Sequence, residues 1–453
     1  MKSTRPSPAS ACPSGIWINP LSTQTTGFVH RHRPQEPRGR WWGAWCVCFI
    51  LACLGCKPRQ IVRKTPYMDT PVRDWIRVLL VQAAETCRID ADSGLAVHPV
   101  KEPLWTTPDE PPLAAEAATV RLGVAQGQLT VNDQPIESPG VTITPVDPFV
   151  FRLDGKAYRG RLVVLLDAQA TGLQIINWIP LEPYLAGVIG AEMPTYWEPE
   201  ALAAQTIASR TYCLYIKRRF GARRNWDLSG TQAHQVYRGL QAESAQVWDA
   251  VQRTEGRVLT ARDSAGTIEV FPAFYSAICG GHTEDSAHVF GDAYTPLQGV
   301  TCSYCQDVAR LNQFYWPGVH VTQAEATQRL HARYPRLQAL GDIVALVPRR
   351  QSDYGGFHRL TSIQVTGATG QTDVLRGEDL RLTLDSSGKR IKSVVCEIKK
   401  DEQGWVFQSG RGWGHGVGLC QCGAQGQARR GKSAYDILTY YFPGAEIVCL
   451  DSM

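Results

Sequence analysis

The stretch LQIINWIPLEPYLAGVIGAEMPTYWEPEALAAQTIASRTYCLYIKRRFG, residues 173–221, combines two kinds of pattern. Its beginning, LQIINWI, is a short period-two segment, which is typical of a β-strand. Its end starts with Pro199 at a first-turn position, carries acidic residues nearby, and closes with Lys and Arg before Gly221. Proline and acids at the start, with bases and glycine at the end, are helix boundary signals. We therefore predict a strand followed by a helix over 199–221.

Further elements are predicted on both sides of this stretch. Between Val120 and Ile179, the segments VRLGV, VTITPV, FVFRL and RLVVLLD are separated by Gly, Asp and Pro turns, which indicates successive strands. GRVLTA and TIEVFPAFYS predict strands after the helix. Residues 318–400 combine the helical segment VTQAEATQRLHARY with the strand-like HRLTSIQVTG and IKSVVCEIK. We predict an α+β fold: a β-rich body, a central helix and a β-rich inserted subdomain over 318–400.

The charge distribution limits the classes of partner. The chain has 453 residues, which is long enough for more than one domain. Residues 1–56 hold six basic side chains against one acidic side chain, and this excess accounts for the whole formal charge of +5. The remaining residues carry 41 basic and 41 acidic groups. Because binding to a nucleic-acid backbone needs a clustered basic excess, this balance argues against nucleic acid as a partner.

The N-terminal segment RHRPQEPRGRWWGAWCVCFILACLGC has the features of an export signal. An arginine-rich run precedes an apolar stretch from Trp41 to Cys56, which is short for a membrane span. We predict a leader over 1–56 and export to the cell envelope or periplasm. Ala52-Cys53 and Gly55-Cys56 resemble a bacterial lipoprotein cleavage box, so a lipid on Cys56 or Cys53 would anchor the protein to the membrane. A plain signal peptide and a retained anchor are the alternatives.

The next segment is predicted to lack a core. From Lys57 to Ala118, short apolar pieces alternate with polar and proline-rich sequence such as VHPVKEPLWTTPDEPP. Such composition is typical of flexible connections. We therefore predict a tether and linker over 57–118 and a folded domain over 119–453.

Glu192 is the first candidate for chemistry. It lies between the apolar run LAGVIGA and Met193-Pro194, so its neighbours on one side should be buried. A carboxyl held against apolar groups has a raised pKa, which keeps it protonated and able to donate a proton. On the predicted helix, Gln205, Ser209 and Tyr212 share one face, with Arg210 one step around. The alternative is that a glutamate in a loop before a helix is a cap or a solvated side chain.

Two cysteine-containing pairs suggest a metal site. Cys279 and His282 form C-x2-H, and Cys302 and Cys305 form C-x2-C. Two such pairs at this separation match a closed four-coordinate zinc site, in which thiolate and imidazole are preferred ligands. Because no open position is evident, the zinc would be structural. A disulfide from Cys279 to Cys302 or Cys305 is the alternative in an exported protein. No H-E-x-x-H motif is present around these residues, which excludes that class of metalloprotease site.

The segment GRGWGHGVGLCQCGAQGQ, residues 410–427, is rich in alternating glycines. No frame completes G-x-G-x-x-G, and the Lys-Ser/Thr pair of a P-loop is absent, so a phosphate site is excluded. Alternating glycines with aromatic residues indicate a strand or turn whose backbone lies close to another element or to a ligand. Trp413 and His415 should project on the same side. His415 is suited to bind a carboxylate or a sugar, and a buried structural histidine is the alternative. Cys420 and Cys422 are interpreted as free thiols or as paired elsewhere.

Eight blocks, in the same order along the chain, resemble the stage II sporulation protein D (SpoIID/LytB domain) family. The similarity covers roughly residues 145 to 449. The blocks are GKAYRGRLVVLL, LQIINWIPLEPYLAGVIGAEMP, ALAAQTIASRTYCL, QVYRGL, VQRTEGRVLTA, FYSAICGGHTEDSAHVFG, GRGWGHGVGLCQCGAQGQARRG and ILTYYFPG. Two departures stand out: Cys420 and Cys422 replace a serine and an aromatic residue of the family pattern, and residues 318–400 align poorly, which favours a local insertion.

The resemblance implies a peptidoglycan lytic transglycosylase. Such enzymes cut glycan strands without stem peptides between N-acetylmuramic acid and N-acetylglucosamine, and leave a 1,6-anhydro-N-acetylmuramic acid end. The family's catalytic glutamate lies in an E-M-P motif, which here is Glu192-Met193-Pro194. Residues 119–453 would then be the catalytic domain, with the central helix as its catalytic helix. In this hypothesis one carboxyl first protonates the glycosidic oxygen and then takes the proton of the C6 hydroxyl.

The resemblance also suggests helper residues and alternatives. Gln205, Arg210 and Tyr212 are candidates for orienting the sugar, and His415 and Gln421 are candidates for the opposite wall of the groove. Zinc has precedent among sporulation members of the family, which fits a structural metal site, and no organic cofactor is expected. The main alternative is a non-catalytic glycan-binding modifier or enhancer of a cell-wall amidase. A further alternative is a zinc-stabilised scaffold whose thiols perform redox chemistry.

Overall fold

The computed structural model describes residues 64–101, 104–105, 114–263 and 266–452. All elements below belong to one compact unit that runs from Arg63 to Met453. The leader predicted over 1–56, with its candidate lipidation cysteines, lies outside the described residues. Within the described ranges, no helix is both long enough and apolar enough to cross a bilayer.

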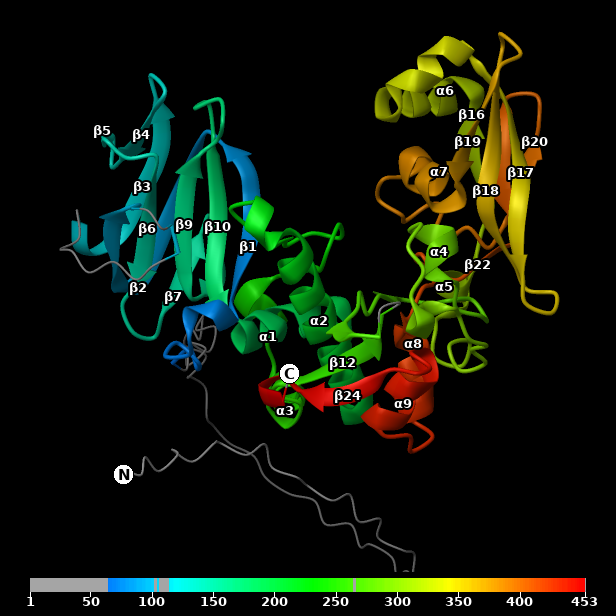
Figure 1. Cartoon of the computed structure of the whole chain (residues 1–453). Coiled ribbons are helices and arrows are strands. Elements are labelled where there is room, and N and C mark those ends of the chain that lie inside the picture. Colours follow the sequence, from blue (N-terminus) through cyan, green and yellow to red (C-terminus); the bar gives the residue numbers. More distant parts are fainter. Residues whose placement is uncertain (1–63, 102–103, 106–113, 264–265, 453) are drawn as a thin grey trace, which may run out of the picture. The chain divides into compact units, whose positions relative to one another are not determined.

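An 11-stranded sheet forms the N-terminal part of the described chain, coloured from blue to green in Figure 1. Its strands are β1 (Trp75–Ala84), β2 (Thr86–Pro99), β3 (Ala114–Ala125), β4 (Gln128–Val131), β5 (Gln134–Pro135), β6 (Gly140–Pro145), β7 (Val150–Leu153), β8 (Lys156–Arg159), β9 (Arg161–Leu166), β10 (Leu173–Pro180) and β11 (Leu228–Ser229). The order is β11-β1-β10-β9-β6-β2-β3-β4-β5, and β7 pairs with β2 and β8. Most neighbours are antiparallel, as in β9 and β10, whereas β1 and β11 are parallel. The strands predicted between residues 120 and 179 are therefore confirmed.

The sheet corrects the prediction of a tether and linker over 57–118. Residues 75–99 form β1 and β2, and β3 begins at Ala114, before the predicted domain start. Ile76 and Ile89 on these strands are fully buried in the main core. In β2 most buried residues alternate with more exposed ones, so the period-two signal was present in the sequence. Its polar positions and the proline-rich sequence that follows obscured that signal.

Two consecutive helices, α1 (Leu181–Glu192) and α2 (Pro199–Phe220), follow β10 directly. Helix α2 confirms the helix predicted over 199–221, with proline in its first turn and Gly221 as its C-cap. It is central, since it contacts α1, α3, α8, α9 and β12. The other elements of this region are α3 (Ala245–Arg253), β12 (Arg257–Arg262), β13 (Ile268–Val270), β14 (Tyr275–Ser276), α4 (Ser286–Val289), α5 (Leu311–Phe314), β23 (Leu419–Cys420), α8 (Gln421–Ala428), α9 (Ala434–Tyr441) and β24 (Glu446–Cys449).

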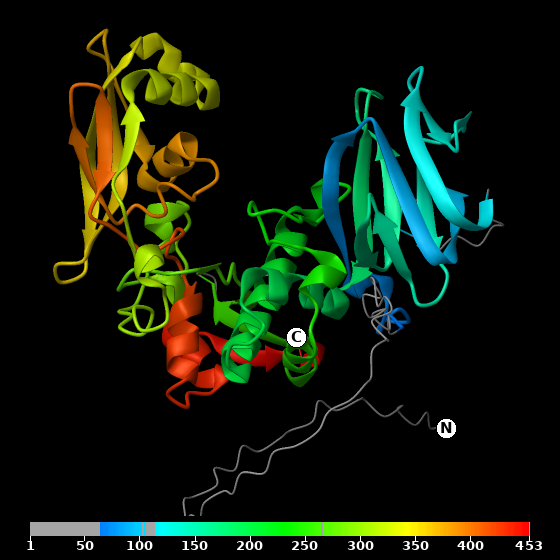
Figure 2. The same ribbon diagram turned by 180° about the vertical axis from the view of Figure 1, so that it is seen from behind.

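A separate subdomain lies between β15 (Tyr315–Trp316) and β22 (Gly410–Arg411), which pair with each other. It contains β16 (Val319–Thr322), α6 (Gln323–Arg333), β17 (Ile343–Asp353), β18 (His358–Gly367), β19 (Thr372–Arg376), α7 (Gly377–Leu384), β20 (Glu397–Lys400) and β21 (Gly404–Gln408). Helices α6 and α7 lie on the same side of its two three-stranded sheets in both views (Figures 1 and 2). It has its own apolar core. The subdomain covers the residues for which we predicted an insertion, and the α+β class is confirmed.

Candidate functional site

Glu192 is the last residue of α1, so it is not the loop glutamate that the alternative interpretation assumed. The run LAGVIGA that precedes it is helical, and its apolar side chains lie in the main core. Gly190 allows a neighbouring segment to come close, because a Cβ at this position would overlap the carbonyl oxygen of Ala242. The N–H of Arg238 donates to the carbonyl oxygen of Gly187 at 3.0 Å. Helix α1 and the segment after residue 234 are thus packed together at the end that carries the glutamate.

Four groups surround the partly buried carboxyl of Glu192. The N–H of Val236 donates to its Oε1 at 2.7 Å. The side chains of Gln421 and Tyr275 also hydrogen-bond to it, and Arg238 adds positive charge nearby. Burial raises the pKa of Glu192, and these hydrogen bonds and this charge lower it less than burial raises it. The net rise agrees with the direction predicted from the apolar run before it.

A second layer of buried amide and hydroxyl groups holds these partners. Gln421 Nε2 donates to Gln205 Oε1 at 3.4 Å, and Gln205 Nε2 donates to Ser209 Oγ at 3.0 Å. Gln235 Nε2 donates to the hydroxyl of Tyr275 at 3.1 Å. Gln205, Ser209 and Gln235 have no exposed surface. The Gln205–Ser209 face of α2 therefore points toward the site, as predicted, but Gln205 acts on Glu192 through Gln421.

Arg210 does not fit the predicted sugar-orienting role. Its side chain is fully buried, and it donates from Nε and Nη2 to the two carboxylate oxygens of Glu182 at 2.9 and 2.6 Å. Its Nη1 donates to the carbonyl oxygen of Arg257 at 3.0 Å. One residue along a helix turns the side chain by about 100°, so Arg210 leaves the Gln205–Ser209 face and enters the core. Its ion pair joins α2 to α1.

Tyr212 also lies in the core. It is 7% exposed, and its ring centroid is 5.7 Å from that of Phe274 and 6.5 Å from that of Tyr275. Burial raises the pKa of its phenol to a value above its ordinary range. Tyr212 therefore packs beside the partners of Glu192, which favours a structural role for this residue over direct contact with a ligand.

His415 fits the alternative interpretation, a structural histidine, rather than a role in binding a carboxylate or a sugar. Its Nδ1 accepts from the N–H of Val417 at 3.0 Å, and its ring also hydrogen-bonds the backbone of Tyr275. Burial is the main cause that lowers the pKa of His415 to about 4, so the imidazole is neutral at pH 7. Its ring packs against Phe274 and Phe290. With both nitrogens engaged, His415 supports the backbone beside the site and offers no free ring nitrogen.

The glycines of the segment 410–418 are explained by close backbone contacts. Gly412, Gly414, Gly416 and Gly418 all have positive φ angles, between 71° and 102°. A Cβ at Gly418 would overlap the carbonyl oxygen of Phe274, and a Cβ at Gly416 would overlap the guanidinium of Arg359. The prediction that this backbone approaches another element is therefore confirmed. The neighbours are the segment that contains β14 and, at Gly416, Arg359 of β18.

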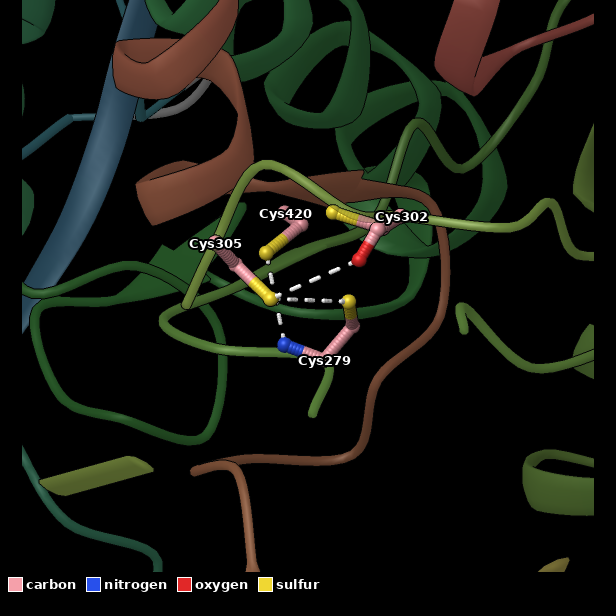
Figure 3. A group of neighbouring side chains, drawn as sticks. All are labelled: Cys279, Cys302, Cys305 and Cys420. Atoms are coloured by element: carbon pink, nitrogen blue, oxygen red, sulfur yellow. Dashed lines mark hydrogen bonds between the residues drawn. The ribbon is translucent and has the colours of Figure 1, made fainter. Parts of the chain in front are cut away.

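Four buried thiols form a cluster, and the ligand set differs from the predicted one. The sulfur atoms of Cys279, Cys302, Cys305 and Cys420 all lie within 4.8 Å of one another (Figure 3). His282 is not among them: its Nδ1 lies 2.6 Å from the carbonyl oxygen of Thr283. The four cysteines are free, which does not support the disulfide alternative.

Strand pairing explains the exchange of His282 for Cys420. Strands β14 and β23 are parallel, and Ser276 is the register partner of Cys420. Cys279 follows β14 by three residues, so this pairing brings residues 279 and 420 together across 141 positions of sequence. Sequence spacing contains no information about such a contact. Cys420 and Cys422 are both free thiols, which agrees with one of the two interpretations drawn from the sequence. Cys420 belongs to the cluster, whereas Cys422 is outside it.

The structure adds three groups that the sequence prediction did not assign a role: Tyr275, Gln235 and the N–H of Val236. All three lie in blocks on which the family resemblance depends, FYSAICGG and QVYRGL. The presence of polar residues in those blocks was the available signal. No periodicity connects them with Glu192, because they come from segments that follow α2.

Comparisons with known proteins agree with this arrangement. The family model described as stage II sporulation protein (SpoIID) matches residues 169–260, which include Glu192, α2 and Gln235. An uncharacterized protein of Brachyspira hyodysenteriae is 30% identical over 320 residues, 71% of this chain and 79% of that protein. Stage II sporulation protein D of Bacillus subtilis is 28% identical over 299 residues, 63% of this chain and 79% of that protein. A protein of Bacillus subtilis named amidase enhancer is 26% identical over 368 residues, 74% of this chain and 50% of that protein. The extent of these matches and the match to the family model identify the chain as a member of the SpoIID family.

Proposed function

We propose that this protein is a peptidoglycan lytic transglycosylase that cleaves glycan strands lacking stem peptides. Membership of the SpoIID family and the likeness to an amidase enhancer support a function connected with the cell wall. The observation that carries the finer proposal is the environment of Glu192. It is a partly buried carboxyl with a raised pKa, and its hydrogen-bond partners are a backbone N–H, a carboxamide and a phenol.

The two ways of breaking a glycosidic bond differ in the number of carboxyl groups that they need. Most glycoside hydrolases use two carboxyl groups, one as acid and one as base or nucleophile. A lytic transglycosylase uses no water, and a single group can serve in both steps. The resemblance to the family, whose catalytic glutamate lies in the E-M-P motif, supports the second reaction type for Glu192.

The proposed reaction has two proton transfers. Neutral Glu192 donates its proton to the glycosidic oxygen, and the bond between C1 and that oxygen breaks. The glutamate, now ionised, takes the proton of the C6 hydroxyl of the same sugar, and O6 forms a bond with C1. The product is a 1,6-anhydro end, and the glutamate is again neutral. Val236 N–H, Tyr275 and Gln421 would stabilise the carboxylate between the two steps.

Location and partners are part of the same proposal. The basic and apolar parts of residues 31–56 support export to the cell envelope, with a lipid on Cys56 or Cys53 as the membrane anchor. The glycan strands of peptidoglycan are the proposed substrate. A cell-wall amidase is a second proposed partner, since one relative carries the name amidase enhancer.

Digestion of purified, peptide-free glycan strands tests this function. We expect the wild-type protein to produce 1,6-anhydro-N-acetylmuramic acid ends, detected by mass spectrometry, and Glu192→Gln to produce none. Glu198→Gln is the matched control, because Glu198 is an exposed glutamate close to Glu192 in sequence, and it should keep full activity. If the wild-type protein binds the strands but releases no product, and accelerates a purified amidase instead, the non-catalytic enhancer is the correct function.

A further inference from the structure

The four-thiol cluster has the dimensions of a metal site. In a tetrahedral site with Zn–S bonds of about 2.3 Å, neighbouring sulfur atoms are about 3.8 Å apart. The Sγ atoms of Cys279 and Cys305 are 3.7 Å apart, and all four sulfurs lie within 4.8 Å of one another. Disulfide sulfurs would be about 2 Å apart. The cluster therefore has the spacing of metal ligands and not that of a disulfide.

The surroundings of the sulfurs also suit thiolates. The N–H of Cys279 lies 3.3 Å from Cys420 Sγ, and the hydroxyl of Tyr441 lies 3.1 Å from Cys302 Sγ. Each of these groups can donate a hydrogen bond to a metal-bound thiolate, as outer-shell groups do in metal sites. All four cysteines are buried, which isolates the site from water. Four thiolates in a closed arrangement are a preferred ligand set for structural zinc.

The ligands flank the two segments that carry the partners of Glu192. Tyr275 and Ser276 form β14, and their register partners in β23 are Leu419 and Cys420. Gln421, which hydrogen-bonds Glu192, directly follows Cys420, and Cys279 lies four residues after Tyr275. The strands are only two residues long, so few backbone hydrogen bonds hold them together. A metal bound to Cys279 and Cys420 would link the two segments beside the site.

We propose that Cys279, Cys302, Cys305 and Cys420 bind one Zn²⁺ and that this metal fixes Tyr275 and Gln421 at their positions beside Glu192. The cysteine at position 420, where the family pattern has serine, then replaces His282 as the fourth ligand. The positioning role rests on the proposed function of Glu192. Metal binding itself does not rest on that function, and the experiment that tests it does not measure enzyme activity.

Metal analysis of purified variants tests the ligand set. We expect about one Zn²⁺ per chain in the wild-type protein and close to none in Cys420→Ser. His282→Ala and Cys422→Ser are matched controls that should retain the metal, because both residues lie near the cluster without belonging to it. After exchange with Co²⁺, the visible spectrum should show tetrahedral cobalt bound to thiolates, unchanged in His282→Ala. Loss of metal in His282→Ala with retention in Cys420→Ser would overturn this ligand set, as would a metal-free wild-type protein whose four thiols are oxidised.

Hydrogen exchange tests the positioning role. On removal of the metal from the wild-type protein by a chelator, we expect amide exchange at residues 275–276 and 419–421 to accelerate by about tenfold or more, with little change in the distant strands β2 and β3. This experiment does not depend on the folding of any cysteine variant. Unchanged exchange at those residues after complete metal loss would disprove the positioning role. If the metal and exchange results hold but no anhydro product forms, the proposed function fails and the metal site stands.

Discussion

Glu182→Gln should destabilise the protein strongly, because it breaks a buried ion pair. The guanidinium of Arg210 donates to both oxygens of Glu182, and neither side chain is more than 10% exposed. Removal of one partner from a buried pair costs about 3–5 kcal/mol, since an uncompensated charge stays in the core. An exposed pair at similar distance, Arg430 with Asp307, provides the control: Asp307→Asn should cost less than about 1 kcal/mol.

Replacement of both partners separates the charge effect from packing. In the double variant Glu182→Leu/Arg210→Met, no unpaired charge remains. The carbonyl oxygen of Arg257 still loses its donor, which costs about 1–3 kcal/mol. We therefore expect the double variant to be more stable than Glu182→Gln and Arg210→Met taken singly. The free energy of unfolding would be measured in urea by tryptophan fluorescence and by circular dichroism, with coincident transitions as the check on two-state behaviour.

Two outcomes would refute this reasoning. If Glu182→Gln is no more harmful than Asp307→Asn, the pair does not hold α1 to α2. If the double variant is stable but no longer binds peptide-free glycan strands, Arg210 contacts the sugar, as the sequence predicted, and its buried position in the structure does not describe the glycan-bound protein.

Two further predictions concern His415 and Tyr275. His415 has its pKa lowered to about 4, against about 6.5 when unfolded, so the unfolded chain binds the proton first as the pH falls. Its contribution to stability is complete above pH 6.5 and is lost as the pH falls toward 4. Urea unfolding across this range should show a smaller loss of unfolding free energy in His415→Gln than in the wild-type protein. Equal losses in the wild-type protein and in His415→Gln would contradict the lowered pKa of His415. Tyr275→Phe removes a hydrogen bond to Glu192. Because hydrogen bonds to charged groups contribute about 1.5–3 kcal/mol, we expect the rate of anhydro product formation to fall by about ten- to a hundredfold. Glycan binding should be unchanged. A wild-type rate in Tyr275→Phe would remove this residue from the mechanism.

Local patterns were sufficient for much of the fold. Period-two segments predicted the strands between residues 120 and 179, and terminal residues predicted helix α2 almost to the residue. The apolar run before Glu192 predicted the direction of its pKa shift, because burial of a short segment follows from its own composition. These features depend on neighbours in sequence, and a sequence displays such neighbours directly.

The partners of each functional side chain were decided only by tertiary structure. Arg210 points to Glu182 because α1 packs on that face of α2, and the helical pattern of α2 does not say which element lies there. Cys420 joins Cys279 because two short strands pair across 141 residues, whereas the spacing of His282 favoured a contact that the folded chain does not make. Distant segments meet where the packing of the whole core brings them together, and that packing is a property of the whole chain rather than of any local stretch.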